Sequence, residues 1–498
     1  MKKTKIVATL GPAVEVRGKN KRLGDDGYWN EPLNKEKSAK EFAKLLKAGT
    51  DVARFNFSHG DHAEHGERMQ VLHMAEKATG KIVGILLDTK GAEIRTTTQD
   101  TPNKKLEFKK GETVRISMDG KKKGNKDVIA VTYPGLYNDV HVGGKILFDD
   151  GLIEMTIKEK DSRKKELVMT VDNDGTLGSN KGVNAPGVSI NLPGITKKDK
   201  EDIIFGLEQG ISYIAASFVR KPKDILDIRK ILKDKKAEYV QILPKIESQE
   251  GIDNFEAIME VADGLMVPRG DMGVEVAPEE VPVIQKKMIQ HANKLGKPVI
   301  TATQMLDSMM ENPRPTRAEV SDVENAVWDG TDATMLSGES ANGEWPVESV
   351  STMATSVEHA EDNVEQFGRR IDLTDESKTS MTDTLAQSTV DIAKNAGAKA
   401  IVASTASGYT ARLIAKYRPS MPILAITYDE TTQRGLTLNF AIYPIVKKAP
   451  KTTDSMIELA KKSAVENKLA KKGDIIIITA GLPLDKPGTT NLVHVVTI

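Results

Sequence analysis

Residues 200–247 have the sequence KEDIIFGLEQGISYIAASFVRKPKDILDIRKILKDKKAEYVQILPKIE. In KEDIIFGLEQG and KDILDIRKILKD, apolar residues recur at spacings of three and four, which is typical of helices that cover a sheet. The runs YIAASFV and VQILPKIE are short and nearly continuously apolar, which is typical of parallel strands buried on both faces. This stretch therefore predicts a helix–strand–helix–strand unit.

The same alternation extends over most of the chain before residue 340. Eight strand patterns occur there, with helical patterns between most of them, and eight such units are what a (β/α)8 barrel requires. The predicted strands are residues 5–11, 51–58, 84–91, 213–219, 240–247, 264–271, 298–304 and 331–339. The sequence therefore predicts an α/β protein built on a (β/α)8 TIM barrel.

The alternation is interrupted after the third strand. Residues 96–192 carry alternating strand patterns such as KLEFKKG and KELVMTVDND, punctuated by Gly, Asp, Asn and Lys as in hairpins. Because a strand-to-helix loop lies over the active-site end of a barrel, this segment is expected to form a small β-barrel lid there. The barrel would then comprise residues 1–95 and 193–368.

A fresh α/β pattern begins near Met381, with strand patterns AIVAS, PILAIT and DIIIITAG between helical ones. We expect a separate C-terminal α/β regulatory domain over residues 369–498. In it, AIVAS leads through TASGYT into a helical pattern. This turn of hydroxyls and glycine could cradle a phosphate or could simply cap the helix.

Composition excludes several classes of function. Lys plus Arg and Asp plus Glu both number 71, so no global positive field exists to bind nucleic acid, and 3 Trp, 9 Tyr and 10 Phe leave few platforms for base stacking. There are no cysteines, which excludes disulfides and thiolate chemistry. No segment approaches the roughly 18 apolar residues of a membrane span, and Gly11 and Pro12 interrupt the only signal-like run. We expect a soluble, cytoplasmic protein.

Polar side chains follow the predicted barrel strands at their carboxyl ends, where active sites of this fold lie. Because alternate residues of a strand share a face, Lys245 is expected beside Glu247, and Arg269 beside Asp271. Further strand-end residues are Arg54, Asn56, Ser58, His59, Asp88, Thr89, Lys90, Glu93, Arg95, Gly270, Thr303 and Gln304. Together these residues form the candidate site.

Two sets of oxygen ligands occur among these residues. Glu247 and Asp271 suit magnesium, which takes one or two carboxylates and completes its shell with substrate and water. A structural ion-pair network is the alternative. A weakly charged set suits a monovalent cation, with ordinary capping and turn hydrogen bonds as the alternative. This set is Asn56, Ser58, Asp88 and Thr89.

Positive charge is also concentrated at this end of the barrel. Arg54, Lys245 and Arg95 supply the positive charge that a phosphoryl group needs during transfer, because negative charge then spreads over its oxygens. Arg54 taken alone would equally suit a core ion pair. Backbone N–H groups near Gly270 and Asp271 could receive a carboxylate or phosphate where RGDMG turns into a helix.

At these residues the chain resembles the pyruvate kinase family, from near its first residue to its last. The motifs are ARFNFSHG, LLDTKGAEIRT, NKGVNAPG, ASFVRK, PKIESQEG, RGDMGVE and ITATQMLDSMMENPRPTRAEVSDVENAVWDGTDATMLSGESANGEWP. The resemblance implies transfer of a phosphoryl group from phosphoenolpyruvate to ADP, giving pyruvate and ATP in the last step of glycolysis. It implies a homotetramer as well.

The resemblance also implies individual roles. The ligands of Mg²⁺ or Mn²⁺ would be Glu247 and Asp271, and those of K⁺ would be Asn56, Ser58, Asp88 and Thr89. Lys245 resembles the lysine that stabilises the phosphoryl group and the enolate, and Arg54 resembles the phosphate clamp. Thr303 resembles the threonine that helps place the proton-delivering water and that binds the substrate carboxylate with Gly270 and Asp271.

Contacts to nucleotide phosphates would come from His59, Arg95 and Lys181, and Glu93 stands where glutamate accompanies potassium dependence in the family. The alternative for His59 is a hydrogen bond at a helix start. The phosphate pocket of a sugar-phosphate activator, often fructose 1,6-bisphosphate, would comprise Thr405, Ser407, Gly408 and Thr410, with residues 488–491 nearby. Ala406 replaces a frequent hydroxyl, and the Trp and Arg of some activator pockets are missing around residues 452–459.

Other departures from the family pattern are Ala92, Pro244, Pro268 and a long connection over residues 13–35. The two prolines fix φ and remove a backbone donor beside catalytic residues, so they are expected to affect the rate and not the activity itself. Two rival functions remain. One is a magnesium-dependent aldolase or lyase acting on pyruvate enolate, which needs neither lid nor Lys181. The other is a metabolite sensor with an inert barrel.

Overall fold

The structure is a computed structural model that describes residues 1–368, 380–483 and 490–498. Its largest sheet has eight parallel strands in the order β13-β12-β3-β2-β1-β16-β15-β14. A parallel bridge between Lys245 and Met266 links β13 to β14 and closes the sheet into a barrel. The predicted TIM barrel is therefore confirmed. Its strands are β1 (Lys5–Thr9), β2 (Val52–Asn56), β3 (Gly84–Asp88), β12 (Tyr213–Ala216), β13 (Gln241–Pro244), β14 (Leu265–Pro268), β15 (Val299–Ala302) and β16 (Ala333–Leu336).

Helices surround this sheet and bury their apolar stripes against it. The large core cluster joins strand residues such as Ile85 and Ile242 to helix residues such as Phe42 and Ile228. The helices are α1 (Lys35–Ala48), α2 (His62–Thr79), α4 (Lys197–Glu208), α5 (Pro222–Asp234), α6 (Gln249–Asp253), α7 (Phe255–Val261), α8 (Arg269–Glu275), α9 (Val281–Leu295), α10 (Arg317–Asp329), α11 (Gly338–Ala341), α12 (Pro346–Asp362) and α13 (Val364–Phe367). The loop before α10 adds a 3-10 turn over Asp307–Met310.

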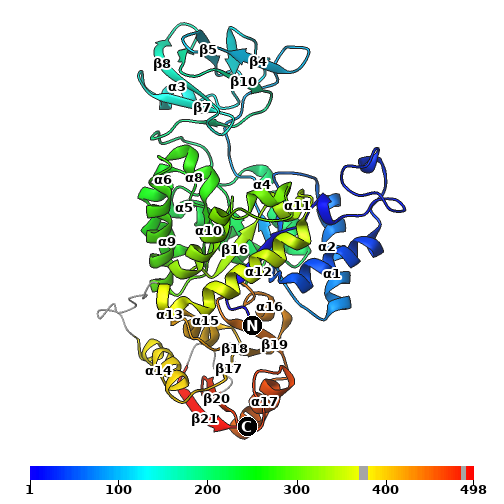
Figure 1. Cartoon of the computed structure of the whole chain (residues 1–498). Coiled ribbons are helices and arrows are strands. Elements are labelled where there is room, and N and C mark those ends of the chain that lie inside the picture. Colours follow the sequence, from blue (N-terminus) through cyan, green and yellow to red (C-terminus); the bar gives the residue numbers. More distant parts are fainter. Residues whose placement is uncertain (369–379, 484–489) are drawn as a thin grey trace.

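The β-rich segment inserted after β3 has a core of its own and lies over the carboxyl ends of the barrel strands (Figure 1). It contains a six-stranded sheet, in the order β11-β7-β8-β9-β5-β6, and a two-stranded sheet of β10 and β4. Its elements are β4 (Lys105–Phe108), β5 (Thr113–Ser117), β6 (Val128–Ala130), α3 (Leu136–Asp139), β7 (Lys145–Phe148), β8 (Ile153–Asp161), β9 (Glu166–Val171), β10 (Gly175–Gly178) and β11 (Val183–Asn184). We call this segment the lid.

The C-terminal α/β segment lies at the opposite end of the barrel from the lid (Figure 1). Its sheet order is β19-β18-β17-β20-β21, parallel except for β21. Its elements are α14 (Met381–Asn395), β17 (Ala400–Ser404), α15 (Tyr409–Lys416), β18 (Ile423–Thr427), α16 (Glu430–Arg434), β19 (Ile442–Val446), α17 (Thr453–Glu466), β20 (Ile475–Ala480) and β21 (Leu492–Thr497). Among the described residues, no helix has the length and apolarity to cross a membrane.

The two prolines that depart from the family pattern are each the last residue of a barrel strand. Pro244 ends β13 and Pro268 ends β14. The ladder resumes at once after Pro244, because the Lys245 N–H donates to the carbonyl of Ala216 at 2.8 Å. The long connection after β1 is held by buried Glu15, which pairs with Arg17 at 3.0 Å and with Arg68 of α2.

Candidate active site

Asp88 is the buried anion at the centre of the barrel mouth. Arg54, which lies on the neighbouring strand, donates from Nε to Asp88 Oδ2 at 2.8 Å, and Lys245 Nζ lies 3.3 Å from Oδ1. Burial alone would raise the pKa of Asp88, but Lys245 and Arg54 outweigh it and hold that pKa below its ordinary value. The predicted strand-end residues from β2, β3 and β13 are therefore brought together around one carboxylate.

Lys245 lies between two carboxylates. Its Nζ is 2.9 Å from Glu247 Oε1 and 3.3 Å from Asp88 Oδ1. Burial alone would lower the pKa of Lys245, but Asp88, Glu247 and Asp271 outweigh it and raise that pKa. The lysine is therefore a permanent cation at neutral pH. Lys245 and Glu247 do lie together, as the alternation of the strand pattern predicts.

Glu247 has one carboxylate oxygen that accepts no hydrogen bond and lies beside the Lys245 ammonium, which suits a cation ligand. Its Oε2 accepts from the N–H of Phe218 at 2.6 Å, whereas its buried Oε1 has no hydrogen bond, since Lys245 approaches it outside hydrogen-bonding geometry. Burial, reinforced by Asp271, raises the pKa of Glu247 against the opposing charge of Lys245. A buried carboxylate in this state gains from a nearby divalent cation.

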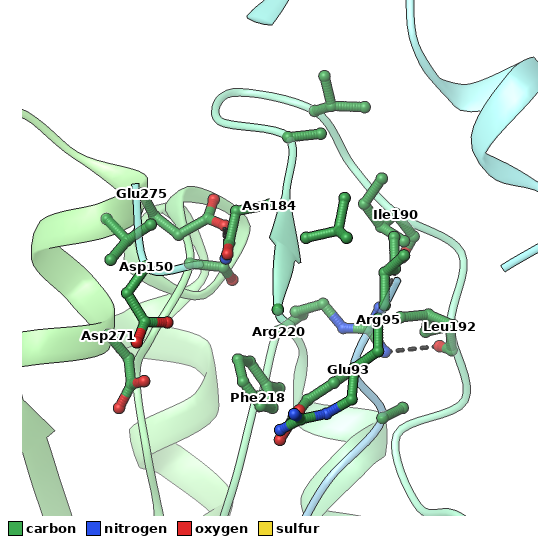
Figure 2. Close-up of a pocket in the computed structure, with 18 of the residues that line it drawn as sticks. Glu93, Arg95, Asp150, Asn184, Ile190, Leu192, Phe218, Arg220, Asp271 and Glu275 are labelled. Carbon is green, nitrogen blue, oxygen red and sulfur yellow. Dashed lines mark hydrogen bonds and ion pairs between the residues drawn. The ribbon is translucent and has the colours of Figure 1, made fainter. Parts of the chain in front are cut away.

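Asp271 lies in the first turn of α8 and lines a cavity of about 270 Å³ between the barrel and the lid. Figure 2 shows it beside Asp150 of the lid. Burial and the charges of Asp271 and Asp149 raise the pKa of Asp150. The described residues contain no cluster of three or more His, Cys, Asp and Glu residues that could enclose a metal. The charge of Asp271 acts on Glu247, and two neighbouring carboxylates suit an ion that completes its shell with substrate and water.

Arg269 does not lie beside Asp271, contrary to the strand-alternation prediction. Helix α8 begins at Arg269 itself, and residues two apart on a helix do not face each other. The guanidinium instead reaches the carbonyl of Thr303 at 2.7 Å and Asp322 of α10. Arg269 therefore supports the loop after β15 and leaves the site to Asp271.

The predicted potassium set lies at the ends of two adjacent strands. Asn56 and Asp88 are register partners on β2 and β3. Asn56 Oδ1 accepts from the N–H of Ser58 at 3.1 Å, and Thr89 follows Asp88 directly and is 4% exposed. One carboxylate and several neutral oxygens within one pair of strand ends fit a monovalent cation, although Asp88 is at the same time the partner of two basic side chains.

Three residues at the barrel mouth have strained backbone. Phe218, Thr303 and Gln304 have φ angles of 53°, 67° and 53°, in the left-handed region that non-glycine residues rarely adopt. The Thr303 hydroxyl accepts from the N–H of Gly270 at 2.8 Å and lies 2.7 Å from the carbonyl of Ala302. Thr303 and Gly270 are therefore brought together, as the functional assignment requires.

The charged residues predicted near the lid form ion pairs at its base. Glu93 pairs with Arg95, which also donates to the carbonyl of Asn180 at 2.8 Å, and Lys181 pairs with Asp149 at 2.9 Å. Figure 2 shows Glu93 and Arg95 lining the cavity opposite Asp150 and Asp271. His59 is exposed in the turn after β2, and its N–H donates to the carbonyl of Asn56 at 3.3 Å.

The hydroxyl-rich turn of the C-terminal domain connects β17 to α15. Gly408 is the residue before α15 and has a φ angle of 78°, and an added Cβ would lie 2.8 Å from Leu436. Thr405 and Thr410 are buried, Ser407 is exposed, and the hydroxyls of Thr410 and Thr490 are 2.8 Å apart. Within the predicted segment 488–491, residues 488 and 489 lie outside the described residues.

Sequence reasoning missed residues that the structure places in the site. Ser217 contacts Lys245 and Asp88, and its place near the carboxyl end of the predicted strand 213–219 signalled its location but not these contacts. Asp149 and Asp150 reach the barrel from a hairpin of the lid, and Asn184 donates to Glu275 of α8 at 2.7 Å. No local pattern predicts which hairpin of an inserted domain returns over the barrel.

Comparisons with known proteins give matches to one family over nearly the whole chain. A family model described as pyruvate kinase, barrel domain, matches residues 1–350, and one described as pyruvate kinase, alpha/beta domain, matches residues 383–496. The chain is 53% identical over 494 residues to a pyruvate kinase of Lactobacillus delbrueckii subsp. bulgaricus, covering 99% of this chain and 80% of the relative. It is 50% identical over 499 residues to a pyruvate kinase of Geobacillus stearothermophilus, with the same coverage. A crystal structure of a pyruvate kinase from Cryptosporidium parvum superposes with a TM-score of 0.87 at 35% identity, covering 100% of this chain and 96% of that one.

Proposed function

The chain belongs to the pyruvate kinase family of phosphotransferases, and from this premise we propose that it transfers the phosphoryl group of phosphoenolpyruvate to ADP with the help of Mg²⁺ and K⁺. The observation that carries the proposal is the position of Lys245, a buried cation within 3.3 Å of Asp88 and 2.9 Å of Glu247. These carboxylates belong to the two proposed cation sites. A phosphoryl group that passes from phosphoenolpyruvate to ADP here would lie near both bound cations and the Lys245 ammonium.

Lys245 and Arg54 perform the electrostatic work of the transfer in this proposal. Their charges lie where the transferring group spreads negative charge over its oxygens, and Asp88 holds both side chains in place. When phosphoenolpyruvate loses its phosphoryl group, an enolate remains, and the Lys245 ammonium then stabilises that oxygen. Lys245 is too firmly protonated to serve as the proton donor.

Thr303, Gly270 and Asp271 hold the other end of phosphoenolpyruvate in this account. Thr303 has a strained backbone conformation, and its hydroxyl accepts a hydrogen bond from the Gly270 N–H at the start of α8. A substrate carboxylate would replace this hydroxyl as the acceptor of the Gly270 N–H. Thr303 then orients the water that protonates the methylene carbon, since a threonine hydroxyl is too weak an acid to act unaided.

Glu247 and Asp271 would hold Mg²⁺, with Mn²⁺ as a substitute. Bound there, the ion would neutralise charge on the phosphate and carboxylate of the substrate. The Oε1 of Glu247 supports this assignment, because it is buried and accepts no hydrogen bond, although it lies 2.9 Å from the Lys245 ammonium. K⁺ would be held by Asn56, Ser58, Asp88 and Thr89, and the carboxylate of Glu93 at the lid base marks a potassium-dependent enzyme.

ADP would bind between the lid and the barrel. His59, Arg95 and Lys181 supply its phosphate contacts, and Lys181 must then leave Asp149, to which it is bound at 2.9 Å. The Lys181 side chain is 43% exposed, so it can turn from Asp149 toward a bound nucleotide. A lid that brings Lys181 to the barrel distinguishes this function from a lyase on pyruvate enolate.

We further propose that the chain divides into barrel residues 1–95 and 193–368, lid residues 96–192 and a regulatory domain of residues 369–498. A sugar phosphate would bind at Thr405, Ser407, Gly408 and Thr410. The backbone of Gly408 supports this. Its φ is left-handed and an added Cβ would clash with Leu436, so the turn at the start of α15 requires a glycine there and exposes backbone N–H groups that suit a phosphate. Signals from this pocket would pass to the barrel in a cytoplasmic homotetramer.

Coupled measurement of pyruvate formed from phosphoenolpyruvate and ADP tests the proposal. Turnover that requires Mg²⁺, rises with K⁺, and saturates at lower phosphoenolpyruvate when a sugar phosphate is added is the expected result. Pyruvate released by C–C cleavage of a 4-hydroxy-2-oxo acid, without turnover of phosphoenolpyruvate, would favour the lyase. Folded protein with no turnover but with sugar-phosphate binding would favour the sensor.

A further inference from the structure

The hydroxyl of Ser217 connects the ends of three neighbouring barrel strands, β3, β12 and β13. Ser217 lies one residue beyond β12 and is 4% exposed. Its Oγ is 2.6 Å from the carbonyl oxygen of Thr89 and 2.8 Å from Lys245 Nζ, and 3.3 Å from Asp88 Oδ1. A hydroxyl has one hydrogen, so it donates to the nearest acceptor, Thr89, and accepts from the ammonium.

Both oxygens of Thr89 are held by the same residue. The Thr89 hydroxyl accepts from the backbone N–H of Ser217 at 3.0 Å, while the Thr89 carbonyl accepts from the Ser217 hydroxyl. Ser217 therefore fixes where the oxygens of Thr89 point. Since Asp88 lies within reach of the same hydroxyl, Ser217 contacts two of the four residues assigned to K⁺.

Ser217 is also the neutral acceptor among the close partners of Lys245. The other two partners are the carboxylates of Asp88, at 3.3 Å, and Glu247, at 2.9 Å. Without the hydroxyl, the ammonium would move toward the carboxylates that already attract it and away from an incoming phosphoryl group. The hydroxyl thus gives the ammonium a fixed direction that charge attraction alone does not provide.

The backbone holds Ser217 firmly in this place. The next residue, Phe218, has a φ angle of 53° and donates its N–H to Glu247 Oε2 at 2.6 Å. On the other side, Gly91 approaches so closely that an added Cβ would lie 2.9 Å from the Cβ of Ser217. A strained and closely packed backbone is typical of a side chain that must be placed accurately.

We propose that Ser217 is a positioning residue that couples the monovalent-cation site to Lys245. It orients the oxygens of Thr89 for K⁺ and, through the same hydroxyl, the ammonium for the phosphoryl group. The inference rests on the proposed roles of Lys245 and of the potassium set. Binding of K⁺ and correct placement of Lys245 are then linked events.

The test is Ser217→Ala in the full-length protein. Loss of a supporting contact of this kind typically costs about 10- to 100-fold in affinity or activity, so we expect kcat to fall by that factor and the K⁺ concentration for half-maximal activity to rise by a similar one. The KM for ADP should stay unchanged. A merely structural role would lower the active fraction, and with it kcat, without moving the K⁺ midpoint.

A second readout does not depend on turnover. K⁺ that binds the folded state raises the midpoint of thermal unfolding with increasing concentration. Wild-type protein without substrates is expected to show this rise when KCl replaces tetramethylammonium chloride at constant ionic strength. Ser217→Ala should need about 10-fold more K⁺ for the same rise.

Two matched variants complete the design. Ser212→Ala removes a hydroxyl that is 5% exposed at the opposite end of the same strand, and it should leave kcat and the K⁺ midpoint unchanged. Ser217→Thr keeps the hydroxyl and should restore both. Wild-type kcat and K⁺ dependence in Ser217→Ala would overturn the inference. An inactive Lys245→Met beside such a result would leave the proposed function standing. An active Lys245→Met would overturn the proposed role of Lys245 together with the inference, and a potassium-independent wild type would overturn the proposed potassium site together with the inference.

Discussion

Arg434 of helix α16 in the C-terminal domain forms a two-pronged ion pair with Glu76 of barrel helix α2. Its Nη1 and Nη2 lie 2.6 and 3.0 Å from the two carboxylate oxygens, and Nη1 also donates to the carbonyl of Val83. Both side chains are largely buried. In the same helix, Thr432 donates to the carbonyl of Ala406 in the proposed effector turn. Helix α16 therefore touches both the effector turn and the barrel.

Removing this ion pair should weaken the joint between the two domains. Arg434→Met leaves Glu76 buried without its guanidinium, and breaking a buried pair in this way costs about 3–5 kcal/mol. We expect a lower midpoint of thermal unfolding and a weaker response to the sugar phosphate. The double variant with Glu76→Gln should recover part of the loss. An unchanged midpoint in Arg434→Met would show that the pair does not hold the domains together.

Glu93→Lys should relieve the requirement for potassium. Glu93 pairs with Arg95 at the base of the lid, so the substitution places an ammonium where a carboxylate now stands. Turnover is measured with KCl and with tetramethylammonium chloride at equal ionic strength. The variant should show nearly equal rates in the two salts, while wild type slows without K⁺. An unaltered potassium requirement would exclude Glu93 as the determinant.

Gly408→Ala should abolish activation by a sugar phosphate and spare the basal rate. The new Cβ would meet Leu436 at 2.8 Å and force the turn before α15 to move. Gly397→Ala is the matched control, because Gly397 has a similar φ angle of 64° but no atom within 4 Å of an added Cβ. The measurement is phosphoenolpyruvate saturation with and without effector. Equal activation in both variants would place the effector site elsewhere.

The buried Lys5 should make stability rise with pH. Its Nζ donates to the carbonyl of Ile442 at 2.6 Å and lies 4.2 Å from the ring centre of Tyr443. Burial, only partly offset by Asp51, lowers the pKa of Lys5 to about 8. Between that value and 10.5, the folded state binds fewer protons than the unfolded state, so deprotonation favours folding. Wild type should gain about 2 kcal/mol over Lys5→Met between pH 7.5 and 9.5.

This prediction is checked by thermal unfolding of both proteins across that range. The interval stops at pH 9.5 because burial raises the pKa of Tyr443, so ionisation of this tyrosine in the unfolded state opposes folding at higher pH. Parallel pH profiles for wild type and Lys5→Met would contradict the assignment.

The barrel could be predicted because parallel strands buried on both faces consist of nearly continuous apolar residues. Strands β19 and β21 lacked that signature. IYPIV contains Pro444 and lies at one edge of the C-terminal sheet, and LVHVVT lies half exposed at the other. Edge strands need bury only one face and tolerate proline, so their patterns are weak.

Within the site, the alternation of side chains along a strand predicted which residues lie together only where the extended backbone continues past the end of the strand. Lys245 and Glu247 meet as expected, but α8 begins at Arg269 and turns that side chain toward Asp322. The role of Ser217 was equally hidden, because its contacts with Thr89 and Lys245 depend on how three strand ends meet in space. Local patterns do not encode such convergence.

In the proposed mechanism, Lys245 provides the positive charge for phosphoryl transfer. The most direct test compares kcat of wild type and Lys245→Met at saturating phosphoenolpyruvate, ADP, Mg²⁺ and K⁺, with folding checked by circular dichroism. Loss of a group that acts mainly in the transition state predicts a fall of about 100- to 1,000-fold or more with little change in substrate saturation. A folded Lys245→Met protein with near-normal kcat would contradict the account.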